Sequence, residues 1–223
     1  TKYKAIGEIT PNYIFKEEVP NRIQKNLNNI RFIIMLRNPV NRAFSSYKYS
    51  ILNEGIKETF IEHLSKDDDV FKRGLYYEQI KRWINYFPID QFLILIFEEV
   101  VKEPEIAFKK IAEFLSIDYR KFKLQNLCKK INPSGSIPRF HSLYVRYQRF
   151  LLFLKKKNLY KLYKIIIKIY LKFKNRLKSS SLVMKENITE MNPNDQKNLF
   201  TKYESDIKNL EKLLNKNLSL WRP

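Results

Sequence analysis

The sequence predicts an α/β fold with a mostly parallel sheet, because two short apolar runs alternate with helical patterns. Residues 31–36 and 91–97 are continuous apolar runs, rich in β-branched and aromatic side chains and too short for buried helices. Such runs are typical of parallel strands that are buried on both faces. Alternation of strands and helices then places the helices against the sheet.

Helices are expected at seven places, among which residues 74–87 show apolar residues three and four positions apart and residues 18–29 are polar. In chain order they cover residues 18–29, 39–52, 57–65, 74–87, 104–116, 141–176 (one or two very basic helices) and 193–216. The helix that follows the first strand has Asn38 as a candidate cap and Pro39 at its first position, both favoured there. Residues 128–140 read as a loop, and Ser179–Ser181 as a linker.

Composition places the chain among soluble globular proteins and excludes disordered, collagen-like and coiled-coil classes. Its 223 residues are 44% hydrophobic and 30% charged. Cys128 is the single cysteine, which excludes an intrachain disulfide and a Cys-based zinc site and favours a reducing compartment. No apolar run approaches the ~20 residues that span a bilayer. Because Thr1 stands where an initiator Met or a signal peptide is expected, the sequence suggests an excerpt or a processed form.

The positive charge of the chain is concentrated in one segment. Lys and Arg total 43 against 23 Asp and Glu, a net charge of +20. Residues 119–185 hold 19 of the basic residues and no acidic one, whereas the rest holds 24 basic and 23 acidic residues. Such a field attracts sulfated or carboxylated glycans, nucleic acid or anionic lipid headgroups. A Lys-, Asn- and Ile-rich codon bias is the other explanation.

A candidate anion site lies after the first predicted strand. Arg37 ends that strand, and Ser45 lies eight residues on, about two turns into the following helix. Ligands of open α/β sheets bind at the carboxyl ends of strands, where helix N-termini receive anions. Arg supplies a charged fork and Ser a hydroxyl donor, with Arg42 on a nearby face. The alternative is an arginine paired at a strand end and an ordinary helical serine.

Residues 37–47 (RNPVNRAFSSY) resemble the 3′-phosphate-binding motif of sulfotransferases that use 3′-phosphoadenosine 5′-phosphosulfate (PAPS). Further segments are similar, in the same order, to the bacterial and heparan-sulfate-type branch of that family. They are Gly7–Tyr13, Gly74–Gln79 with Trp83 and Phe87-Pro88, Phe97–Glu99, Asn132–Arg139 and Asp206–Trp221.

The resemblance implies a P-loop-NTPase-like parallel sheet flanked by helices, with a helical C-terminal extension. Residues 1–127 would form the α/β core without its N-terminal part. Residues 128–223 would form a nucleotide-covering loop and the basic helical part of the same domain. The family's 5′-phosphosulfate loop and its catalytic base are expected upstream of Thr1.

The resemblance also assigns roles to individual residues. Arg37 and Ser45 would bind the 3′-phosphate of the nucleotide. Ser134, Gly135 and Arg139 would close over it.

On the acceptor side, Arg73 and Tyr76 would line the pocket between nucleotide and acceptor, although Tyr76 also fits a core position. Glu8 is the one candidate catalytic carboxylate. His63 and His141 are expected at the surface, and Cys128 is expected to be buried or incidental.

The implied reaction is transfer of a sulfuryl group from PAPS to a hydroxyl or amine, which leaves 3′-phosphoadenosine 5′-phosphate and needs no metal. The expected acceptor is a glycan or another carbohydrate. Ile9 stands where heparan-sulfate members have Lys, which counts against a heparan-type acceptor.

The basic residues 141–176 would hold an anionic polysaccharide or a membrane surface, or form a solvated face; nucleic acid is not expected. The expected location is cytoplasmic, with at most peripheral membrane contact. The alternative function is a non-catalytic basic module that binds polyanions or a membrane surface.

Overall fold

The computed structural model describes residues 5–121, 137–138, 150–151, 153–154, 157, 159–177, 183–184 and 190–223. The chain forms two compact units. The first consists of Thr1–Ala43, Leu64–Ile131 and Met191–Pro223, and the second of Phe44–His63 and Asn132–Glu190. The expected division between residues 127 and 128 stays a prediction.

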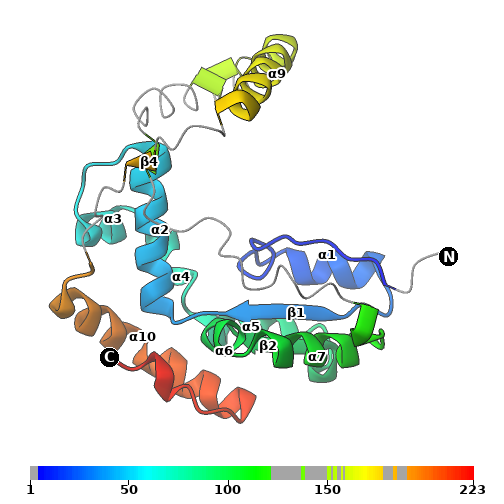
Figure 1. The fold of residues 1–223 in the computed structure, drawn as a ribbon. Coiled ribbons are helices and arrows are strands. Elements are labelled where there is room, and N and C mark those ends of the chain that lie inside the picture. Colours follow the sequence, from blue (N-terminus) through cyan, green and yellow to red (C-terminus); the bar gives the residue numbers. More distant parts are fainter. Residues whose placement is uncertain are drawn as a thin grey trace. The chain divides into compact units, whose positions relative to one another are not determined.

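The first unit contains the sheet and the helices that pack on it. Its elements are α1 (Val19–Asn26), β1 (Phe32–Leu36), α4 (Asp68–Lys72), α5 (Tyr76–Ile84), η1 (Ile89–Gln91), β2 (Phe92–Ile96), α6 (Phe97–Lys102), α7 (Pro104–Leu115), η2 (Tyr119–Lys121), α10 (Pro193–Leu214) and η4 (Ser219–Trp221). In Figure 1, β1 and β2 lie side by side, and α6 and α7 follow β2. The short helices α4 and α6 were not predicted.

The two predicted strands pair in parallel, which confirms the α/β class. Phe32 is opposite Phe92, and Leu36 is opposite Ile96. The prediction that both strands are buried on both faces is wrong for β1, because Ile33 is 41% and Met35 51% exposed. Hydrophobic composition reveals a strand but cannot tell whether another element covers its second face.

The covered face of the sheet packs against an aromatic core. The Phe32 ring lies 5.1 Å from Trp83, 4.7 Å from Phe87 and 4.8 Å from Phe92, measured between ring centroids. Trp83 belongs to the predicted amphipathic helix, and its indole N–H donates to the carbonyl of Ile14 at 3.1 Å. Aromatic burial therefore joins β1, β2 and α5, and the indole bond adds the N-terminal segment.

Two side chains of α10 join it to α4 and to α5. Tyr203 stacks on Phe71 at 4.7 Å, and its hydroxyl donates to the Phe71 carbonyl at 2.9 Å. Asp206 accepts the backbone N–H of Tyr77 at 3.1 Å, which satisfies an otherwise free donor at the start of α5.

The second unit contains most of α2 (Pro39–Glu54), which begins in the first unit, and the first part of α3 (Phe60–Lys66). Phe44 packs edge-to-face on Phe60 at 5.2 Å, which holds α2 against α3. This unit also holds α9 (Tyr160–Leu177) and an antiparallel pair of β3 (Ile137–Pro138) with β4 (Val183–Met184). β3 lies where the sequence predicted a loop.

Gly74 is a position where we expect even one methyl group to destabilise the fold. A Cβ at Gly74 would lie 2.7 Å from the ring of Tyr203, which its stacking and its hydrogen bond hold in place. We expect Gly74→Ala to lower the free energy of unfolding by about 1–3 kcal/mol, measured by urea denaturation. Gly7→Ala is the matched control, because a Cβ there meets no atom within 4 Å. Equal stability of both variants would contradict the tight packing.

Asp206 should make the protein less stable as the pH rises, which is the opposite of what most carboxylates do. Burial raises the pKa of its carboxyl to about 6 from an ordinary 3.8, although backbone N–H groups of α5 lower it. The folded state therefore holds this proton more tightly than the unfolded state. The contribution of Asp206 to the free energy of unfolding should therefore fall by about 2–3 kcal/mol as the pH rises from about 4 to 6.

Asp206→Asn tests this, because the amide stays neutral while its oxygen can accept the same N–H. We expect the variant to lose this decline and to exceed the parent in stability above pH 6, measured by denaturation across the pH range. Glu204→Gln is the control on the same helix, where Glu204 pairs with Lys208 at 2.9 Å on the surface. A decline that persists in Asp206→Asn would show that another group causes it.

Candidate functional site

The carboxyl end of β1 leads directly into the N-terminus of α2, as the sequence predicted. The side-chain oxygen of Asn38 accepts the N–H groups of Val40 at 3.0 Å and Asn41 at 3.2 Å, which confirms it as the cap. Pro39 opens the helix with a φ already suited to it. Asn38 is 6% exposed, so this turn is fixed from within the core.

Glu98 ties this turn to the end of β2 and to the end of the chain. One of its carboxylate oxygens accepts the backbone N–H of Asn38 at 2.9 Å, and the other accepts the indole N–H of Trp221 at 3.1 Å. The Asn38 amide donates in turn to the Trp221 carbonyl at 2.9 Å. The carboxyl ends of both strands are thereby held in one hydrogen-bonded network.

Arg37 lies between this network and α5. Its carbonyl accepts the hydroxyl of Tyr76 at 2.9 Å, and its guanidinium lies 5.1 Å from the centroid of the Phe97 ring. No carboxylate of the described residues pairs with this guanidinium. The first unit therefore presents a half-buried, uncompensated cation at the sheet edge, next to the positive end of a helix.

Ser45 and Arg42, the other two polar residues near this turn, have different surroundings. Ser45 lies in the part of α2 that belongs to the second unit, with a partly buried side chain. Arg42 belongs to the first unit and donates to the carbonyl of Val70. From the sequence, Arg42 is expected on a face near the proposed site, and the structure shows its guanidinium bound to α4.

The residues expected near the acceptor lie in different surroundings. Tyr76 is buried in the core, and burial raises the pKa of its hydroxyl to about 12, with Arg42 acting in the opposite direction. Arg73 donates to the side-chain oxygen of Asn12 at 2.7 Å and lies 4.6 Å from the Phe15 ring. Glu8 is exposed and accepts the hydroxyl of Thr10 at 3.3 Å. No hydrogen bond or ion pair among the described residues joins Glu8 or Arg73 to Arg37.

Several sequence predictions concern residues outside those that the structure describes. They are Ser134, Gly135 and Arg139 of the expected covering loop, together with His141 and Cys128. The same holds for most of the first half of the basic segment 141–176.

The expectation of a surface position for His63 is wrong. His63 is 6% exposed, and its Nδ1 lies 2.9 Å from a carboxylate oxygen of Glu58. The Tyr47 ring packs at 5.6 Å, and its hydroxyl donates to the Glu58 carbonyl at 2.8 Å. Burial raises the pKa of the Tyr47 hydroxyl, and the Glu58 and Glu62 carboxylates add to the rise. The local pattern could not reveal this, because α2 supplies the ring that covers the histidine.

Sequence reasoning assigned no structural role to Glu98 or to Asp206. Each fell inside a segment of the family resemblance, which was the available signal. Their partners lie 123 and 129 residues away along the chain, so no local pattern marks them.

Comparison with known proteins places this geometry in a family. A family model described as a sulfotransferase domain matches residues 16–133, more than half of the chain. Among relatives, heparan sulfate glucosamine 3-O-sulfotransferase 5 of Mus musculus is 30% identical over 125 residues, which cover 51% of this chain and 36% of that protein. Heparan sulfate glucosamine 3-O-sulfotransferase 6 of Homo sapiens is 30% identical over 118 residues, covering 49% of this chain and 34% of that protein. The chain thus spans about a third of the length of these relatives.

Another relative corrects the expected location. The membrane-associated sulfotransferase kil1 of Dictyostelium discoideum is 23% identical over 216 residues, covering 56% of this chain and 46% of that protein. The expectation of a cytoplasmic protein, at most peripheral to a membrane, is therefore wrong by the standard of its relatives. Among the described helices, none is long and apolar enough to cross a bilayer.

The fold has a counterpart of known structure. A crystal structure of a sulfotransferase from Alicyclobacillus acidocaldarius superposes with a TM-score of 0.65 at 22% identity, covering 99% of this chain and 68% of the other. This likeness confirms the sheet flanked by helices. Together with the family match over residues 16–133, it shows that the chain belongs to the sulfotransferase domain family.

Proposed function

We propose that the whole protein transfers a sulfuryl group from PAPS to a hydroxyl or amine of a glycan. Arg37 and Ser45 bind the 3′-phosphate of the nucleotide in this proposal. The observation that carries it is the uncompensated guanidinium of Arg37 at the carboxyl edge of the sheet.

The surroundings of Arg37 suit an anion ligand. The Phe97 ring supports the guanidinium through a cation–π contact and leaves its N–H groups free to donate to phosphate oxygens. The Tyr76 hydroxyl fixes the main chain of Arg37, so little ordering is needed when a phosphate binds. The N-terminus of α2 adds the partial positive charge of the helix dipole, while its first N–H groups are already bound by the Asn38 side chain.

The transfer itself requires a cationic site for the leaving group. The acceptor oxygen or nitrogen forms a bond to sulfur while the bond between sulfur and the bridging phosphate oxygen breaks. The electron pair stays on the 5′-phosphate, and the acceptor proton passes to a base. Positive groups stabilise this developing charge. Glu8 is the candidate base, and its exposed position leaves it accessible to an acceptor.

A glycan acceptor is supported by the relatives whose names specify heparan sulfate glucosamine. The basic segment supports an anionic polysaccharide, since Lys161, Lys164 and Lys168 are exposed on α9. Ile9, which is 94% exposed, supplies no cation on the acceptor side and argues for an acceptor other than heparan sulfate. A panel of glycans with radiolabelled PAPS and the whole protein would identify the acceptor.

Arg37→Ala should abolish the preference of the chain for a nucleotide with a 3′-phosphate. We expect the affinity for 3′-phosphoadenosine 5′-phosphate to fall by roughly 10- to 100-fold, because a charge-assisted bidentate contact is lost. Calorimetric titration measures it, with AMP as the ligand that lacks the 3′-phosphate. Arg22→Ala, which removes an exposed guanidinium from α1, should leave both affinities unchanged.

The same titration separates the sulfotransferase from a basic module that binds polyanions. That alternative predicts equal binding of the two nucleotides and a steep loss of affinity with salt. If folded parent and Arg37→Ala bind 3′-phosphoadenosine 5′-phosphate equally, the proposed site is wrong.

Ser45→Ala should have a smaller effect than Arg37→Ala. Loss of one hydroxyl bond to a charged phosphate is worth about 1–2 kcal/mol, or roughly 5- to 30-fold in affinity. The measurement is the titration described above, with Ser46→Ala as the neighbouring control. An unchanged affinity in Ser45→Ala would remove Ser45 from the site and leave Arg37 as its proposed ligand.

A further inference from the structure

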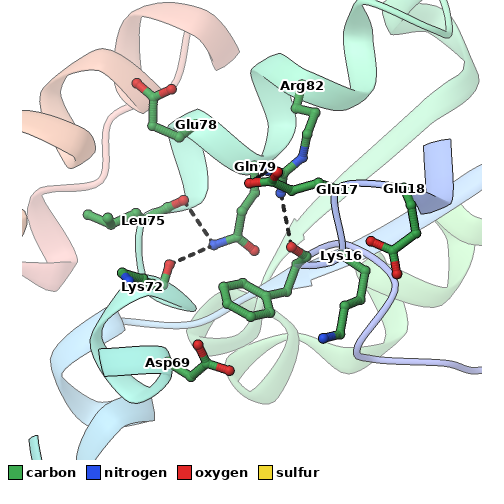
Figure 2. A pocket seen from close by; sticks show the side chains of 10 residues that line it. Lys16, Glu17, Glu18, Asp69, Lys72, Leu75, Glu78, Gln79 and Arg82 are labelled. Carbon is green, nitrogen blue, oxygen red and sulfur yellow. Dashed lines mark hydrogen bonds and ion pairs between the residues drawn. The ribbon is translucent and has the colours of Figure 1, made fainter. Parts of the chain in front are cut away.

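Arg37 is held by its main chain, unlike another arginine of the first unit. Arg82 lines a cavity of about 490 Å³ and is held by its guanidinium, which donates to the Phe15 carbonyl at 3.1 Å and pairs with Glu17 at 3.3 Å (Figure 2). The guanidinium of Arg37 instead contacts the Phe97 ring, which does not occupy its N–H groups. The direction in which the Arg37 side chain leaves the backbone is therefore set by the backbone itself.

The peptide group between Arg37 and Asn38 is bound at both of its polar atoms. Its carbonyl oxygen accepts the Tyr76 hydroxyl at 2.9 Å, and its N–H donates to a carboxylate oxygen of Glu98 at 2.9 Å. A peptide group is planar, so two bonds at its opposite edges prevent it from rotating about the chain. These bonds thus restrain ψ of Arg37 and φ of Asn38.

The sheet restrains the residue on the other side of Arg37. Leu36 ends β1, is 1% exposed, and lies opposite Ile96 in the parallel register. Arg37 consequently lies between a buried strand residue and a peptide group that is bound at both edges. The direction of its Cα–Cβ bond follows from these two restraints.

The first two residues of α6 both act on Arg37. The Phe97 ring lies 5.1 Å from the guanidinium, and the Glu98 carboxylate binds the peptide group that follows. The second oxygen of Glu98 accepts the Trp221 indole N–H at 3.1 Å. Among the ion pairs of the described residues, none joins Glu98 to Arg37. Glu98 therefore holds the backbone without taking the N–H groups that a phosphate would use.

We propose that Glu98 is a positioning residue of the nucleotide site, an inference that rests on the proposed function. It holds the peptide group after Arg37 so that the guanidinium is directed to the 3′-phosphate before the nucleotide binds. Without Glu98, binding would have to order this turn, and the conformational entropy lost would weaken affinity. Glu98 does not touch the nucleotide in this proposal, so its effect passes through Arg37.

The test is a double-mutant cycle, in which calorimetric titration compares 3′-phosphoadenosine 5′-phosphate with AMP. We expect Glu98→Ala to weaken binding of the 3′-phosphorylated nucleotide by roughly tenfold and to change binding of AMP by less than about twofold. In the Arg37→Ala background, Glu98→Ala should have no further effect on either nucleotide. Such non-additivity is the signature of a residue that acts through its neighbour.

Two further variants make the test specific. Glu98→Gln keeps the side-chain volume and one acceptor oxygen, so its affinity should lie between those of the parent and Glu98→Ala. It also provides the measurement if Glu98→Ala does not fold. Glu99→Gln is the matched control, because it removes the next carboxylate of α6, which pairs with Lys216 at 2.6 Å. We expect it to leave both affinities unchanged, and circular dichroism checks that all variants are folded.

A merely structural role for Glu98 would give a different pattern. Its variants would then weaken both nucleotides equally, and the loss would persist in the Arg37→Ala background. That pattern, or an undiminished preference for the 3′-phosphate in both Glu98 variants, would overturn the inference and leave the proposed function standing. Equal binding of the two nucleotides by the parent would instead show that the proposed function is wrong, and the inference would fall with it.

Discussion

The carboxylate of Glu98 holds together the edge of the sheet on which the candidate site depends. It accepts one N–H from the end of β1 and one from the indole of Trp221, and Asn38 returns a bond to the Trp221 carbonyl. Trp221 is 1% exposed, so its N–H would be left unsatisfied without Glu98. Without this carboxylate, the N–H groups of Asn38 and Trp221 would lose their acceptor. The hydrogen bonds that join the three segments containing Asn38, Glu98 and Trp221 would then be weakened.

Two buried tyrosine hydroxyls donate to main-chain carbonyls elsewhere in the first unit. Tyr76 donates to the Arg37 carbonyl and Tyr203 to the Phe71 carbonyl. Burial raises the pKa of both hydroxyls to about 12, while the positive charge of Arg42 acts to lower it. Both groups consequently remain protonated donors throughout the physiological range. The main chain of Arg37 is thus fixed by a neutral donor, and its charge stays available.

The sequence predicted the parts of the fold that local patterns determine. Both strands, the Asn38 cap and the amphipathic face of α5 follow from apolar spacing and from the chemistry of a few residues. The exposure of Ile33 and the burial of His63 do not, because each depends on what other segments cover. For the candidate site, Arg37 and Ser45 stay predictions made from their position after a strand. Glu98 acts through partners 60 and 123 residues away, which no local pattern marks.

Arg37 and Arg42 show why a motif alone cannot assign an anion ligand. Both lie near the start of α2, and the sequence predicts Arg37 as the anion ligand and places Arg42 only on a nearby face. Arg42 donates to the Val70 carbonyl, so binding a phosphate through that N–H would require it to leave α4. Arg37 contacts an aromatic ring, a partner that does not use its N–H donors. The described contacts therefore leave the N–H groups of Arg37 more available than those of Arg42, in accord with the proposed role of Arg37.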